Sequence, residues 1–230
     1  MASAYIQTPT PNLQESRNFY AKLGFVSEKE NPNLFTDGKA HIEINPDRMA
    51  RLGICLKKDT WVKELDTISG FSKVLVIEGG HLIADPSGVW VYLLEKNLHA
   101  TEAKEDFEGQ TGVLGSFAGI SIETVDMVKS LEFYNRLGFQ VEAGAAESGY
   151  VSCQWEGFTL TFLRALNCPH LFFNPSLTYF NGKENPAIIQ KVRDLQIPIT
   201  EEITYFNKTG MVDNIILRDP GGLGFFVFND

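Results

Sequence analysis

Few side chains in this sequence are suited to acid–base, nucleophilic or metal chemistry. The chain has 4 histidines and 3 cysteines. Segment 40–45 alternates apolar and polar residues as a strand does, so His41, Glu43 and Asn45 share one face. An imidazole and a carboxylate on one face can transfer protons or bind a divalent metal ion. The cysteines lack C-x-x-C spacing, so neither a disulfide framework nor a cysteine-built zinc site is expected.

The composition is that of a folded globular chain. Its 230 residues are 43% hydrophobic and 21% charged, which excludes a disordered or fibrous protein. With 20 Lys and Arg against 29 Asp and Glu, the net charge is −9, which argues against a nucleic-acid partner and is compatible with cationic ligands. No apolar stretch has membrane-spanning length and no basic, apolar leader opens the sequence, so a cytoplasmic protein without membrane contact is expected.

An internal repeat organises the chain. Segment 12–25 returns as segment 126–139 at a constant offset of 114. Each copy predicts a short helix, with Asn12 or Asp126 as N-cap and a glycine at its end. Six residues are identical in register, namely Ser16, Phe19, Tyr20, Leu23, Gly24 and Phe25 with Ser130, Phe133, Tyr134, Leu137, Gly138 and Phe139.

A second motif also occurs twice. Asp85-Pro-Ser-Gly88 and Asp219-Pro-Gly-Gly222 are turn sequences, and an apolar strand-like run follows each. Further helices are predicted to begin near Asp59 and at Asn185, the latter as N-cap with proline after it. Between these landmarks the pattern indicates a βαβββ unit that is present four times.

The repeat divides the chain into two domains of two units each. Residues 1–98 form the predicted first domain, 99–115 a linker with acidic and small residues, and 116–230 the second domain. The second half is longer, and its extra residues are expected in loops around 167–185 and 203–210.

These features together resemble the vicinal oxygen chelate superfamily, which includes glyoxalase I, bleomycin-resistance proteins, fosfomycin-resistance enzymes and extradiol dioxygenases. The resemblance covers nearly the whole chain. It implies an α+β fold in which four βαβββ modules pair into two incomplete barrels, each around a cleft. In metal-dependent members the cleft holds a divalent metal, but the fold alone does not decide which chemistry a member performs.

The resemblance also implies metal-ligand places on the first, fourth, fifth and eighth strands of each half. In strand order these places hold Tyr5, Glu43, Gly53 and Tyr92 in the first half, and Gly119, Thr161, His170 and Phe226 in the second half. Glu43 and His170 are the two residues of a type that fits a divalent metal.

The use of Glu43 and His170 depends on how the modules pair. If module one pairs with module four, both residues share a cleft; if neighbours pair, they do not. In a shared cleft they form either a metal-free acid–base pair or, with His41, a set of two histidines and one carboxylate around a metal. A hydrogen-bonded polar pair without chemistry, or two unrelated residues, is the alternative.

Aromatic side chains at the other places favour a binding function. Tyr5, Tyr92 and Phe226 occupy ligand places, and Trp90 and Phe228 lie on the same strand faces two residues away. An aromatic-lined cleft suits a flat or cationic organic ligand.

We therefore interpret the chain as a small-molecule-binding protein that needs no metal or other cofactor. One alternative is a metal-dependent lyase, isomerase or dioxygenase that uses Glu43 and His170, with or without His41. Another is a structural or regulatory protein with a vestigial cleft. Four modules in one chain are compatible with a monomer or a homodimer.

Overall fold

The first half of the chain forms two βαβββ modules in sequence. The protein is described by a computed structural model over residues 2–29, 31–95 and 112–229. Module 1 consists of β1 (Ser3–Pro9), α1 (Leu13–Lys22), β2 (Val26–Ser27), β3 (Leu34–Thr36) and β4 (His41–Asn45). Module 2 consists of β5 (Gly53–Lys58), α2 (Val62–Ile68), β6 (Leu75–Ile77), β7 (Gly80–Ala84) and β8 (Trp90–Glu95). The predicted linker, 99–115, lies largely outside the described residues, so the domain boundaries stay predictions.

The second half repeats this order with longer connections. Module 3 consists of β9 (Phe117–Thr124), α3 (Met127–Arg136), β10 (Gln140–Ala145), β11 (Tyr150–Trp155) and β12 (Phe158–Arg164). Module 4 consists of β13 (Ser176–Phe180), α4 (Asn185–Asp194), β14 (Ile199–Ile203), β15 (Asn214–Arg218) and β16 (Gly224–Phe228). Part of the extra length forms the connections 165–175 and 204–213, and part lengthens the strands β10 to β12. The prediction of a loop around 167–185 is wrong in its second part, because residues 176–180 form β13.

Neighbouring modules share a sheet, which settles the pairing that the sequence left open. The strand orders are β2-β3-β4-β1-β5-β8-β7-β6 and β10-β11-β12-β9-β13-β16-β15-β14. The modules join where β1 runs antiparallel to β5, and β9 to β13. Neither sheet closes on itself, so the α+β fold of two incomplete barrels is confirmed.

Local signals set the helix boundaries largely as predicted. The Asn12 side chain accepts hydrogen bonds from the first turn of α1, and Asp126 does the same for α3. Gly24 follows α1 with φ 81°, a left-handed conformation that glycine adopts without strain. The prediction that Asn185 caps α4 is wrong by one residue. Asn185 is the first residue of the helix, and its buried amide donates to the Val227 carbonyl instead.

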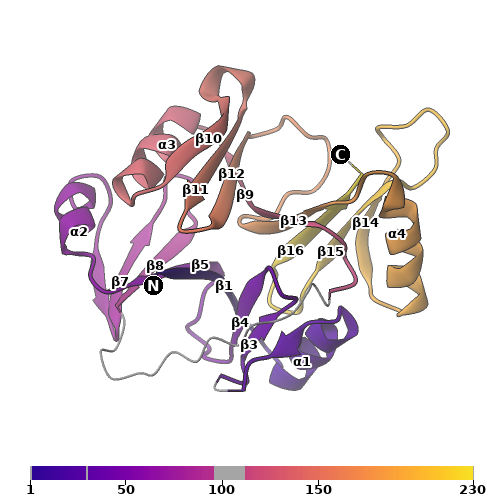
Figure 1. Cartoon of the computed structure of the whole chain (residues 1–230), viewed down its shortest axis with the longest axis horizontal. Helices are drawn as coiled ribbons and strands as arrows, with labels where there is room; N and C mark the ends of the chain where they lie inside the picture. Colours follow the sequence, from indigo (N-terminus) through magenta and orange to yellow (C-terminus); the bar gives the residue numbers. More distant parts are fainter. Residues whose placement is uncertain (1, 30, 96–111, 230) are drawn as a thin grey trace.

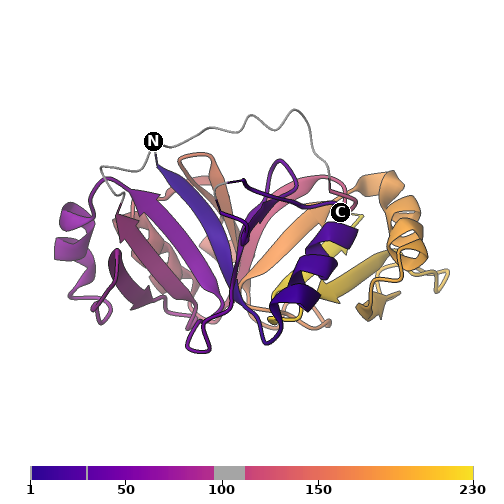
Figure 2. The ribbon, with the colours of Figure 1, turned by 90° about the horizontal axis from the view of Figure 1, so that it is seen from below.

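One continuous hydrophobic core joins both sheets and the helices α1 to α4. On each strand, alternate residues such as Ile6, Ile42 and Ile54 face this core and are fully buried. The helices lie at the two ends of the molecule, α2 with α3 and α1 with α4 (Figures 1 and 2). The opposite face of each sheet is its outer face, and the core separates the two outer faces. Among the described residues, none of the helices combines the length and apolar character that a bilayer crossing requires.

The two repeated motifs hold the halves together. The Tyr20 hydroxyl in the first helix donates to Asp219 of the second turn motif at 2.8 Å. Reciprocally, the Tyr134 hydroxyl donates to Asp85 of the first turn motif at 3.1 Å. Each aspartate also accepts backbone N–H groups of its own turn. The repeat thus encodes a reciprocal contact that joins module 1 to module 4 and module 2 to module 3.

Candidate functional site

The outer face of the first sheet carries polar and aromatic side chains from β1, β4, β5 and β8. Gln7 on β1 pairs with Glu43 on β4 and with Gly53 on β5, and Gly53 pairs with Trp90 on β8. Since every second residue points outward, the strand registers bring one set of side chains together. We call this set the first outer face; it comprises Tyr5, Gln7, His41, Glu43, Asn45, Gly53, Cys55, Trp90 and Tyr92.

A glycine makes room for an aromatic ring in the first outer face. A Cβ atom on Gly53 would lie 2.9 Å from Tyr92 Cε2 and 2.5 Å from the Trp90 carbonyl oxygen. The Tyr92 ring therefore lies across β5 at Gly53, where any larger residue would collide with it. The Trp90 and Tyr92 rings are 6.3 Å apart, and the Arg51 guanidinium lies 5.8 Å from the Trp90 ring centroid. Both rings are half-buried, which leaves part of each accessible to a ligand.

Tyr5, Glu43 and Cys55 form a second cluster on this face. Burial raises the pKa of Tyr5, and the neighbouring Cys55 and Glu43, which hydrogen-bond with its hydroxyl, raise it further. Burial, and then Glu43, likewise raise the pKa of the Cys55 thiol well above its ordinary value. Tyr5 and Cys55 are therefore neutral at physiological pH, and Cys55 lacks the lowered pKa of a catalytic thiol. The Glu43 carboxylate also accepts a hydrogen bond from Asn31 at 3.3 Å.

A hydrogen-bond network fixes the remaining polar groups. Asn45 donates to the Gln7 side-chain oxygen at 2.9 Å, and Gln7 donates to the Arg51 carbonyl at 3.0 Å. The Tyr92 hydroxyl reaches the same carbonyl at 3.4 Å. His41 makes its ion-pair contact with Glu28, at 3.5 Å, rather than with Glu43. The face is thus preorganised around Glu43 and the rings.

The second outer face differs in chemistry. Gly119 and Thr161 occupy the predicted ligand places, and the adjacent Ser121 and Thr178 hydroxyls are hydrogen-bonded to each other at 2.7 Å. Phe226 and Phe228 stack with centroids 5.4 Å apart. These hydroxyl and aromatic groups are poor ligands for a divalent metal.

The connection 165–175 covers part of this second face with its own aromatic residues. Phe172 packs edge-on against Phe226 at 4.8 Å. Phe173 lies so close to Gly224 that a Cβ atom there would be 2.5 Å from the Phe173 ring. As a result Phe226 is 1% exposed, and it is not accessible to a ligand while these side chains stay in place.

The prediction that His170 lies on the fifth strand of the second half is wrong. That strand is β13, Ser176–Phe180, and His170 belongs to the preceding connection. The apolar run after His170 has the composition of a strand, but its side chains fold over the sheet instead of extending it. The His170 ring lies 5.3 Å from Phe228 and 5.9 Å from Phe226. Burial lowers the pKa of His170, and Glu201 and Glu123 partly oppose the change.

The structure does not bring His41, Glu43 and His170 together. Glu43 and His41 lie on the first outer face and His170 on the second, with the core between them. Across residues 2–29, 31–95 and 112–229, no three His, Cys, Asp or Glu side chains are close enough to hold a metal ion. The Glu43 oxygens are already engaged by Tyr5 and Asn31. These donors do not fit the divalent metal that the fold family implies.

Comparison with solved structures supports the fold over nearly the full length of the chain. A 2,2',3-trihydroxybiphenyl 1,2-dioxygenase from Sphingomonas wittichii has a TM-score of 0.55 at 16% identity, covering 98% of this chain and 91% of that chain. A variant of homoprotocatechuate 2,3-dioxygenase from B. fuscum has a TM-score of 0.58 at 15% identity, covering 100% and 71%. A Mn(II)-bound glyoxalase from Novosphingobium aromaticivorans has a TM-score of 0.54 at 15% identity, covering 96% and 79%.

The chain therefore has the vicinal oxygen chelate fold, the fold of extradiol dioxygenases and glyoxalases. Neither the protein-family models nor the curated proteins compared with the sequence gave a match. At these identities the likeness concerns the fold, and the function must be argued from the residues of this chain.

The predicted site residues fall into two groups. Tyr5, Glu43, Trp90 and Tyr92 lie on the first outer face, whereas His170, Phe226 and Phe228 pack together on the second. Sequence reasoning missed Gln7, Asn31 and Arg51, which surround the first group. Gln7 lies two residues after Tyr5 on the same strand face, so alternation alone would have identified it.

Proposed function

We propose that the protein binds a small organic ligand, aromatic and cationic, on its first outer face without a resident metal. The observation that carries the proposal is that the half-buried Tyr5, Trp90 and Tyr92 rings and the Glu43 carboxylate lie on one sheet face, with Glu43 beside Tyr5.

The chemistry of the face favours a cation. Aromatic faces attract positive charge, and the Arg51 guanidinium, 5.8 Å from the Trp90 ring centroid, makes a cation–ring contact of the kind that a cationic ligand would make. Glu43 adds a negative charge beside Tyr5, and the net charge of −9 favours the approach of cations. Binding of this type is worth about 0.5–2 kcal/mol for each cation–ring contact.

The engagement of the Glu43 carboxylate supports the proposal that no metal is needed. A divalent metal needs several deprotonated or lone-pair donors around one point, and Glu43 is accompanied there by a protonated tyrosine and a protonated thiol. The same neighbours serve an organic ligand well, because they hold the carboxylate in one orientation.

The test is an equilibrium titration with ethidium, a flat aromatic cation, in buffer containing EDTA. Trp61 and Trp155 are buried at 0% and 6% exposure, so quenching of the half-buried Trp90 reports on the face. We expect saturable binding, about five-fold weaker in Glu43→Gln because a rim charge contributes up to about 1 kcal/mol. The matched control is Glu132→Gln, an exposed glutamate on α3, which should bind like wild type.

Three results would contradict the proposal: no binding up to about 1 mM ethidium, binding that requires a metal, or equal affinity in Glu43→Gln and wild type. The anionic dye 1-anilinonaphthalene-8-sulfonate should bind this face more weakly than ethidium.

A further inference from the structure

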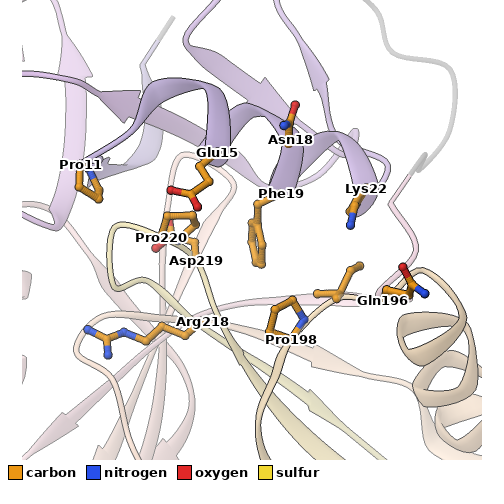
Figure 3. Close-up of a pocket in the computed structure, with 11 residues that line it drawn as sticks. Pro11, Glu15, Asn18, Phe19, Lys22, Gln196, Pro198, Arg218, Asp219 and Pro220 are labelled. Atoms are coloured by element: carbon orange, nitrogen blue, oxygen red, sulfur yellow. The ribbon is translucent and has the colours of Figure 1, made fainter.

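A surface groove separates α1 from the turn after α4, away from both outer faces. Its volume is about 570 Å³. Figure 3 shows Phe19 of α1 pointing into the groove, with Glu15 and Lys22 on the same helix on either side and Pro198 opposite. Among the described residues, the Glu15 carboxylate and the Lys22 ammonium make no hydrogen bond or ion pair.

The internal repeat supplies a second copy of this interface, and there the corresponding space is filled. Phe71, in the turn after α2, lies 6.0 Å from the ring of Phe133 on α3. The Arg136 guanidinium lies 5.2 Å and the Lys129 ammonium 6.0 Å from the Phe71 ring. Arg136 also donates to the Thr67 carbonyl of α2 at 3.0 Å. Phe133 is fully buried as a result.

The two copies correspond residue by residue on their first helices. With the offset of 114, Phe19 corresponds to Phe133, Lys22 to Arg136 and Glu15 to Lys129. The turns differ, because segment 70–72 is Gly-Phe-Ser and segment 196–198 is Gln-Ile-Pro, without an aromatic residue. Phe19 accordingly keeps 8% exposure. The groove therefore marks the place where one copy of the interface lacks its aromatic ring.

We propose that this groove binds a short peptide with a central aromatic residue. The occupant of the second copy is itself a peptide segment, Gly-Phe-Ser, whose ring rests on the helix phenylalanine beneath a cation. In the groove, Lys22 supplies a cation at the position of Arg136, whereas Glu15 puts a carboxylate at the position of Lys129.

The spacing of the two charges matches a tripeptide. Glu15 and Lys22 are seven positions apart, which is about 10 Å along a helix that rises about 1.5 Å per residue. An extended tripeptide is also about 10 Å long. Its ammonium faces Glu15 and its carboxylate faces Lys22 when the central ring lies on Phe19.

The test is a titration of isotope-labelled protein with the tripeptide Gly-Phe-Ser, followed by the amide signals of α1 and of 196–198. Gly-Ala-Ser removes the ring, and the acetylated, amidated form removes both charges. We expect saturable shifts with Gly-Phe-Ser, none with Gly-Ala-Ser, and about two- to five-fold weaker binding in Glu15→Gln and in Lys22→Gln. Lys39→Gln, an exposed lysine outside the groove, is the matched control.

A blocking variant makes the assignment specific. Asn18 is exposed on α1 and lines the groove, so Asn18→Trp places a ring there without disturbing the core. We expect this variant to fold like wild type and to lose binding. Absence of saturable shifts up to about 10 mM peptide, equal binding of Gly-Ala-Ser, or full binding by a folded Asn18→Trp variant would overturn the proposal.

Discussion

Substitution of Tyr134 by phenylalanine tests how the two halves are held together. The Tyr134 hydroxyl donates to the buried Asp85 carboxylate at 3.1 Å. A hydrogen bond to a charged group contributes about 1.5–3 kcal/mol, and one between neutral groups about 1 kcal/mol. Tyr134→Phe should therefore lower the free energy of unfolding by about 2 kcal/mol when Asp85 is ionised.

The contribution of Asp85 to the free energy of unfolding depends on pH. Burial raises the pKa of Asp85 from 3.8 to about 6, while the bonds from Val89, Ser87 and Tyr134 oppose that rise. An aspartate with a raised folded-state pKa contributes its stability fully below pH 3.8 and loses it as the pH rises through about 6. At about 1.4 kcal/mol per pH unit, the contribution lost is about 3 kcal/mol. Removing the Tyr134 hydroxyl raises this pKa further.

Urea denaturation at two pH values measures the effect. We expect Tyr134→Phe to lose about 2 kcal/mol at pH 7.5 and about 1 kcal/mol at pH 4.5, where Asp85 is protonated in the folded protein. Tyr150→Phe, at an exposed position on β11, should change stability little at either pH. An equal loss at both pH values, or a larger loss at pH 4.5, would refute the role of the buried carboxylate.

Three further substitutions or modifications test other parts of the structure. Gly53→Ala should destabilise the protein by about 1–3 kcal/mol through its clash with the Trp90 carbonyl oxygen and the Tyr92 ring; unchanged thermal denaturation would contradict that geometry. Phe71→Ala should lower the free energy of unfolding by about 2 kcal/mol, since this ring is half-buried and loss of a fully buried ring costs more. Added Gly-Phe-Ser should raise the melting temperature of this variant again, because its ring can take the place of the Phe71 ring. No rise in melting temperature would argue against this replacement. In thiol titration of the native protein at pH 8, the half-buried Cys168 should react well before the fully buried Cys55, and the reverse order would show that the first outer face opens.

The repeat made much of the fold predictable. Phe19, Tyr20 and other residues of the first helix recur at one constant offset, so the position of one helix predicts the position of the other. The two turn motifs likewise predict the last strand of each half. The sequence did not reveal why Tyr20 is repeated. Its partner, Asp219, lies in the other half of the chain, and a contact between repeats has no local pattern.

The site was predictable where strand alternation held. Tyr5, Glu43 and Tyr92 lie on the same sheet face because their strands are regular and share one sheet. His170 was misplaced because an apolar run next to a turn has the same composition whether it extends a sheet or folds over it. Long-range packing against Phe226 decides between these outcomes, and nothing local in the sequence encodes it.

Amide chemical shifts can locate the ethidium-binding site on the protein. The measurement uses isotope-labelled protein in buffer with EDTA, and compares wild type with Glu43→Gln. We expect saturable shifts concentrated on β1, β4, β5 and β8 in the wild type, and about five-fold weaker binding in Glu43→Gln. Shifts confined to the second outer face, or none that saturate without a metal, would contradict the proposal.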